Sequence, residues 1–150
     1  MSLKTRILED VKSAMREHER EQLAALRLVT AAIKQKEVDD RIELSDEQVL
    51  AVLDKMAKQR RESIEQYEKA GREDLVAPER FELGLIQAYL PEPLGEDELA
   101  SLIQSTMAEV GASSIRDMGS VMNALRGQVQ GRADMKTVSQ TVKTLLVTPH

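Results

Sequence analysis

The stretch from Ser45 to Gly71, SDEQVLAVLDKMAKQRRESIEQYEKAG, decides the fold class of this 150-residue chain. Ser45 and Gln48 have the spacing of a capping box, and Gly71 suits the left-handed backbone at which many helices end. Between them the apolar residues recur at helical spacing, at Val49, Val52, Leu53, Met56, Ile64 and Tyr67. The stretch therefore predicts a helix over residues 46–70, the longest in the chain.

Helical periodicity continues on both sides of this helix, and no alternating strand pattern competes with it. Apolar residues share one face over a first helix that contains Ile7 to Met15 and over a second that contains Leu23 to Ile33. A turn over residues 72–77 is expected before a fourth helix. Pro78 is tolerated in the first turn of that helix, because its missing N–H has no helical partner there.

The segment from Leu90 to Gly95, LPEPLG, is the expected boundary between two modules. Its two prolines hold the backbone extended and forbid a continuous helix through it. Three shorter helical patterns follow, the first ending at Gly111 and the last beginning at Asp134. We therefore predict an all-α protein, with an amino-terminal bundle of about four helices with long antiparallel helices at 1–90 and a small three-helix carboxy-terminal module at 91–150.

The composition excludes several classes of functional site. The chain has no Cys and only two His, which removes thiol nucleophiles, disulfides and Cys-based metal sites and disfavours imidazole cages. No HExxH, Walker A or GxSxG spacing occurs, and the acidic residues of 39–47 match no calcium-binding loop. We therefore expect no catalytic residues, no bound metal and no cofactor.

Neither the amino terminus nor the interior has the pattern of a secretory signal or a membrane span. Charged residues interrupt the first ten residues, where a secretory signal needs an unbroken apolar run. The longest stretch without a charged residue covers 99–108, far short of the roughly 20 apolar residues that cross a bilayer. These features lead us to expect a cytoplasmic protein without a membrane partner.

The net charge of −5 conceals a difference between the two ends of the chain. Residues 1–111 carry a net charge of −8, whereas residues 112–150 hold five Lys and Arg against two Asp and Glu, a net charge of +3. Attraction to polyanions follows local charge density, so the carboxy-terminal segment is the better candidate for contact with nucleic acid.

Four cations of this segment are the predicted nucleic-acid-binding residues. Lys136 and Lys143 share one face of the last predicted helix, since seven residues make nearly two turns. Arg126 and Arg132 flank the glycine-containing turn before that helix. Lys and Arg neutralise phosphates, although ordinary solvated surface charge is the alternative interpretation.

Several longer motifs resemble the YqeY proteins of the GatB/YqeY family. They are Arg27 with Ala31-Ala32-Ile33-Lys34 and Glu37, Ile64 to Leu75, Tyr89-Leu90-Pro91-Glu92, Asp117 to Met122, and Gly131-Arg132-Ala133-Asp134. The match runs in order over nearly the whole chain. It implies an all-helical, two-part protein similar to the tail of the B subunit of glutamine-dependent aminoacyl-tRNA amidotransferase, which helps that enzyme hold its tRNA.

The resemblance also implies a family-level activity, that of a carbon–nitrogen ligase with glutamine as amide donor. This chemistry requires a glutaminase site and an ATP-dependent activating site, and the chain offers no nucleophile, phosphate loop or metal cage for either. We therefore expect a non-catalytic module that binds or accompanies tRNA through the carboxy-terminal cations. The alternative is a protein-interaction adaptor, whose amino-terminal module docks on a synthetase or an amidotransferase.

Overall fold

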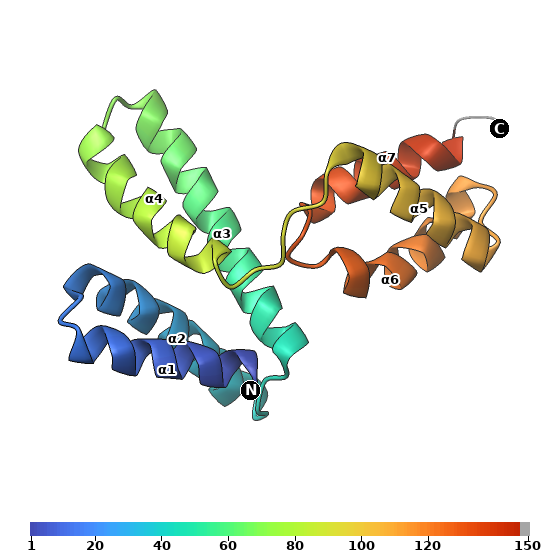
Figure 1. The fold of residues 1–150 in the computed structure, drawn as a ribbon. Helices are drawn as coiled ribbons and strands as arrows, with labels where there is room; N and C mark the ends of the chain where they lie inside the picture. Colours follow the sequence, from blue (N-terminus) through green and yellow to red (C-terminus); the bar gives the residue numbers. More distant parts are fainter. Residues whose placement is uncertain (148–150) are drawn as a thin grey trace. The chain divides into compact units, whose positions relative to one another are not determined.

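A computed structural model describes residues 1–147, which form seven α-helices and one short 3₁₀ helix (Figure 1). The prediction of an all-α protein is confirmed. The chain divides into two compact units, the first ending at Pro91 and the second beginning at Glu92. Within the described part of the chain, no helix is both long enough and apolar enough to cross a membrane.

The first unit contains four helices, arranged as two antiparallel pairs (Figure 1). Their bounds are α1 Leu3–Arg16, α2 Arg20–Asp40, α3 Asp46–Lys69 and α4 Glu73–Gln87. One apolar side of each helix turns inward, so that all four contribute to a single core. Its fully buried members include Ile7, Leu26, Val29, Val49, Leu53 and Ile86.

The long helix α3 begins and ends where local sequence rules place its ends. The Gln48 N–H donates to Ser45 Oγ at 3.3 Å, and the Ser45 N–H donates to Gln48 Oε1 at 2.9 Å, so the capping box is formed. After Lys69 the backbone reaches Gly71 with a φ of +69°, which only glycine adopts readily. Both predicted ends of this helix are confirmed to within one residue.

The helix α4 begins earlier than the sequence predicted. Residues 72–77 were expected to form a turn, but the helix starts at Glu73 and contains Pro78 in its interior. Asp74 in the first turn accepts two hydrogen bonds from the Arg72 guanidinium, at 3.0 and 2.9 Å, and Val76 is buried in the core. Because Pro78 has no N–H, a helix that starts at Glu73 lacks one helical hydrogen bond at this position. The contacts of Asp74 and Val76 stabilise the first turn and compensate for this loss.

The second unit is built from three helices and a 3₁₀ turn. The bounds are α5 Glu96–Val110, η1 Ile115–Asp117, α6 Met118–Val129 and α7 Met135–Val147. Its core brings together buried residues of all three α-helices, including Leu99, Ile103, Val121, Leu125, Val138 and Val142. Met118 and Met122 pack against this core, where the flexible Met side chain fills gaps.

Short polar side chains begin the later helices of the second unit. The Asp117 carboxylate accepts hydrogen bonds from the N–H groups of Ser113 and Ser114, at 2.9 and 3.2 Å, which hold the pKa of Asp117 below its usual range. The Asp134 carboxylate accepts from the Lys136 N–H at 3.2 Å in the first turn of α7. The expected role of Asp134 as a helix cap is therefore confirmed.

Candidate nucleic-acid interface and neighbouring surfaces

The four cations predicted to bind nucleic acid differ in their exposure. Arg126 is exposed in the last turn of α6, and Lys136 and Lys143 are exposed on α7, seven residues apart. None of these three side chains forms an ion pair with another residue of 1–147. Their charges are therefore available to a partner in solution.

Arg132 is partly buried and has a structural contact. Its Nε–H donates to the Glu92 carbonyl oxygen at 2.9 Å, and its own carbonyl oxygen accepts from the Leu94 N–H at 2.8 Å. These bonds tie the turn before α7 to the segment that leads into the second unit. The sequence analysis missed this role, because the partners lie about 40 positions away along the chain and no local pattern connects them.

The solvent face of α7 is polar and free of carboxylates. The helix contains no Asp or Glu, and its exposed polar residues are Lys136, Thr137, Gln140, Lys143 and Thr144. The hydroxyls of Thr141 and Thr144 donate to the carbonyl oxygens four residues earlier, at 2.9 Å in each case. A polyanion that approaches this face meets two ammonium groups and no acidic side chain on the helix itself.

The basic character is local to α7 and does not extend over the second unit. The helix α5, whose acidic residues are exposed, packs onto the same core through its apolar face. Residues 92–150 together hold five Lys and Arg against seven Asp and Glu, a net charge of −2. Residues 1–91 carry −3. The contrast between −8 and +3 noted in the sequence therefore depends on dividing the chain after Gly111, inside one compact unit.

A groove of about 480 Å³ lies between α1 and α2 in the first unit. It is lined by Lys4, Leu8, Arg27, Thr30, Ala31, Ile33, Lys34 and Glu37. The α2 residues of this lining include most of the first family motif, which the sequence analysis used only for the resemblance. Their positions along α2 already placed them on one helix face, but the contribution of α1 was not visible in the sequence.

One ion pair sits at the side of this groove. The Lys4 ammonium donates to both carboxylate oxygens of Glu37, at 2.9 and 2.8 Å, and Glu37 also accepts from the Leu44 N–H at 2.9 Å. The Lys4 hydrogen bond, the Leu44 N–H and the Lys4 charge hold the pKa of Glu37 below its ordinary value. Arg27 and Lys34, in contrast, are exposed and have no ion pair within residues 1–147.

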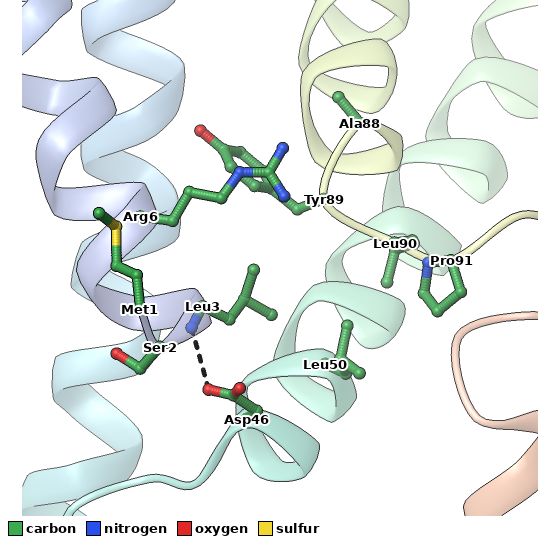
Figure 2. Close-up of a pocket in the computed structure, with 10 residues that line it drawn as sticks. All are labelled: Met1, Ser2, Leu3, Arg6, Asp46, Leu50, Ala88, Tyr89, Leu90 and Pro91. Atoms are coloured by element: carbon green, nitrogen blue, oxygen red, sulfur yellow. Dashed lines mark hydrogen bonds between the residues drawn. The ribbon is translucent and has the colours of Figure 1, made fainter.

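A second pocket of the first unit, of about 470 Å³, is shown in Figure 2. The Arg6 guanidinium lies over the ring of Tyr89, 5.0 Å from its centre, and the Tyr89 hydroxyl donates to Asp10. Burial and the Asp10 carboxylate raise the pKa of Tyr89 above its ordinary value. The Leu3 N–H donates to Asp46 at 2.9 Å. These polar groups bind one another and join parts of the unit, so their role in this pocket is structural.

Arg60 of α3 is also used within the fold. In the sequence, Lys58 and Arg61 each have a residue of opposite charge four positions away on the same helix, and Arg60 has none. In the structure the Arg60 Nε–H donates to Glu82 of α4 at 2.6 Å, and the same nitrogen lies 3.5 Å from Glu79. This cation joins α3 to α4 and is not a candidate phosphate ligand.

The family model described as Yqey-like protein matches residues 4–146, almost the whole chain. The chain belongs to the YqeY-like family. The resemblance stated from the motifs is confirmed at this level, and the name of the family indicates no catalytic activity. Residues of 1–147 also contain no cluster of three or more His, Asp or Glu side chains arranged to hold a metal ion.

Fungal proteins are similar to this YqeY-like chain. Altered inheritance of mitochondria protein 41 of Pyrenophora tritici-repentis is 29% identical over 144 residues, which are 94% of this chain and 79% of that protein. The protein of the same name from Eremothecium gossypii is 41% identical over 83 residues, covering 55% of this chain and 45% of that protein. The one from Vanderwaltozyma polyspora is 39% identical over 82 residues, 54% and 44% of the two chains.

These names contradict the cytoplasmic location expected from the sequence. All the relatives reported above are named as mitochondrial proteins. The expectation rested on the absence of a secretory signal pattern and of a membrane span. Mitochondrial import depends instead on amphipathic, arginine-rich segments poor in acidic residues, which the test for an apolar run does not detect. The expectation of a cytoplasmic protein for this YqeY-like chain was therefore wrong.

Proposed function

We propose that this chain is a non-catalytic helical module that binds tRNA through α7. The observation that carries the proposal is the solvent face of this helix, where Lys136 and Lys143 are exposed without a carboxylate on the same helix. Arg126 adds an exposed cation on the preceding helix. The similarity to the tail of an amidotransferase B subunit that the motif resemblance implies supports tRNA as the polyanion.

The side chains available favour recognition of the phosphate backbone and of RNA shape. The Phe and Tyr residues of the chain, Tyr67, Phe81 and Tyr89, all lie in the first unit and the chain has no Trp, so the second unit has no Phe, Tyr or Trp on which a base can stack. Ammonium groups, an amide and hydroxyls contact phosphates and 2′-hydroxyls without reading base edges. The proposed module therefore recognises tRNA as a folded polyanion.

The proposal assigns no chemistry to the chain itself. The ion-paired and hydrogen-bonded polar groups described above, the Tyr89 hydroxyl with Asp10 among them, hold helices of the first unit together. Incubation of the purified chain alone with glutamine, ATP and a misacylated tRNA is expected to yield no amidated product. Glutamine-dependent product from the chain alone would contradict the non-catalytic part of the proposal.

A fluorescence anisotropy titration of labelled tRNA across a salt series tests the binding. The affinity is expected to fall with salt, by a log–log slope of roughly 0.7 to 0.9 for each phosphate contacted. The Lys136→Glu/Lys143→Glu variant is expected to bind more weakly and with a slope shallower by about 1 for each lysine.

The matched control is Arg27→Glu/Lys34→Glu, which reverses two exposed cations at the same seven-residue spacing in the other unit. It changes the net charge equally, so it corrects for the long-range effect of charge. Equal losses in both variants would remove α7 as the specific site. A flat titration even at low salt would overturn tRNA binding and direct attention to a synthetase or an amidotransferase as protein partner.

A further inference from the structure

The groove between α1 and α2 combines an apolar wall with two available cations. Arg27, Ala31 and Lys34 lie on one face of α2, with the two cations about 10.5 Å apart along the helix axis at 1.5 Å per residue. Leu8 of α1, 43% exposed, provides apolar surface beside them, and Ile33 of α2 belongs to the core beneath the groove. The small side chain of Ala31 leaves space between the cations for a larger group from a partner.

The charge of the groove is positive although the chain is acidic. Its single acidic lining residue, Glu37, is neutralised by two hydrogen bonds from Lys4. Arg27 and Lys34 then remain as the charges that an incoming group meets, on a chain whose net charge is −5. Charge complementarity therefore selects an acidic partner with an apolar side.

We propose that this groove binds an acidic amphipathic helix of a partner protein. Two carboxylates seven residues apart on that helix pair with Arg27 and Lys34, and an apolar side chain between them packs over Ala31 against Leu8. Two turns of a partner helix match the spacing of the cations, as in other helix-in-groove complexes. A small anion would contact one cation only and leave the apolar wall exposed to water. This inference concerns the first unit and is independent of tRNA binding by α7.

A designed peptide tests the proposal on the full chain. The probe is a labelled alanine- and glutamine-based helix of about 20 residues, long enough to be helical in isolation. It carries two glutamates seven residues apart and two leucines at the third and fourth positions after the first glutamate. Saturable binding that weakens with salt is expected in an anisotropy titration. The absence of saturable binding at low salt would overturn the proposal.

Paired variants of the chain show where the peptide binds. Arg27→Glu/Lys34→Glu is expected to weaken binding by about tenfold or more, because two exposed ion pairs are replaced by two repulsions. Lys136→Glu/Lys143→Glu, with the same spacing and charge change on α7, is expected to leave binding unchanged. Equal effects of the two variants would overturn the assignment to the groove.

A steric variant and two altered peptides separate helix docking from simple charge attraction. Ala31→Phe keeps all charges but fills the space between the cations, and it is expected to abolish binding while the far-UV circular dichroism stays unchanged. A peptide with lysines in place of the glutamates should not bind. If a peptide with alanines in place of the leucines binds as well as the probe, the groove is only an anion site and the proposal fails.

Discussion

Two helices of this chain, α2 and α7, each present two exposed cations seven residues apart, but the surfaces between those cations differ. On α2 the residue between Arg27 and Lys34 is the small Ala31, which opens on an apolar groove beside α1. On α7, Gln140 lies between Lys136 and Lys143 among threonine hydroxyls. The same charge spacing therefore favours a protein helix in one unit and a solvated phosphate backbone in the other.

The two surfaces also differ in whether the nearby carboxylates form ion pairs within the fold. At the groove, Lys4 neutralises the one acidic residue. At α7 the N-cap residue Asp134 provides a carboxylate at the start of the helix, and the other acidic residues of the unit lie in α5, in η1 and at Glu92. The net charge of residues 92–150 is −2. Charges farther away than about 8 to 10 Å are largely screened at physiological salt. The charge next to the surface, and not the charge of the unit, decides which partner is attracted.

Truncation of a core side chain is expected to have the largest effect on stability and to destabilise one unit at a time. Leu26 of α2 and Leu125 of α6 are both fully buried, in different cores. Leu26→Ala and Leu125→Ala should each lower the free energy of unfolding by about 2–5 kcal/mol, measured by chemical denaturation.

The binding assays then show whether each core supports its own surface. Leu26→Ala is expected to impair peptide binding at the groove and to spare tRNA binding, and Leu125→Ala is expected to do the reverse. Loss of both activities in either variant would show that the two units unfold together, which contradicts the expected separation of the two binding activities.

The next largest effects are expected when each of the two double variants is measured in both binding assays. Lys136→Glu/Lys143→Glu should weaken tRNA binding by about tenfold or more, on the basis of the salt slope of two lost phosphate contacts. Adding Arg27→Glu and Lys34→Glu to this variant should cause no further loss of tRNA affinity beyond the long-range charge effect, because these residues belong to the other unit and are not part of the proposed tRNA site. Anisotropy at constant salt measures both.

Within the second unit, substitution of Arg132 and of Arg126 distinguishes a structural arginine from one that is free to bind phosphate. Arg132→Ala removes the hydrogen bond to the Glu92 carbonyl oxygen and is expected to destabilise the unit by about 1 kcal/mol. Arg126→Ala, at an exposed position, should change stability by less than about 0.5 kcal/mol. In the tRNA assay the salt slope should decrease for Arg126→Ala. A decrease that is equal or larger for Arg132→Ala would identify Arg132 as a phosphate ligand in addition to its structural contact.

The smallest expected effect concerns pH and the Lys4–Glu37 pair. The pKa of Glu37 is lowered in the fold, so its contribution to stability is present above the unfolded carboxyl value of about 4.3 and is lost as pH falls through the lowered pKa. Glu37→Gln should therefore reduce the loss of stability on acidification, measured as thermal unfolding between neutral and acidic pH. An unchanged pH dependence would show that this pair contributes nothing to the stability of the groove.

Local rules in the sequence were sufficient for most of the fold. Ser45 with Gln48, Asp134 and Gly71 act through hydrogen bonds and backbone geometry within a few residues, so their helix ends were predictable. The early start of α4 was not predictable, because the burial of Val76 that accompanies it is a property of the folded chain and not of the local sequence. The preference of proline for the first turn of a helix predicted a start of α4 near Pro78, but the helix begins at Glu73 because tertiary packing outweighs the hydrogen bond lost at Pro78.

The residue types along the chain thus set the helical class, the absence of cysteine chemistry and the choice of exposed cations. Their roles depend on contacts between distant parts of the chain. Arg60 meets Glu82 of another helix, Arg132 meets the backbone at Glu92, and Lys4 meets Glu37, each across more than 20 positions. Charge and periodicity are properties of single residues and short windows, whereas whether a cation is free for a ligand depends on which carboxylate or carbonyl the fold brings beside it.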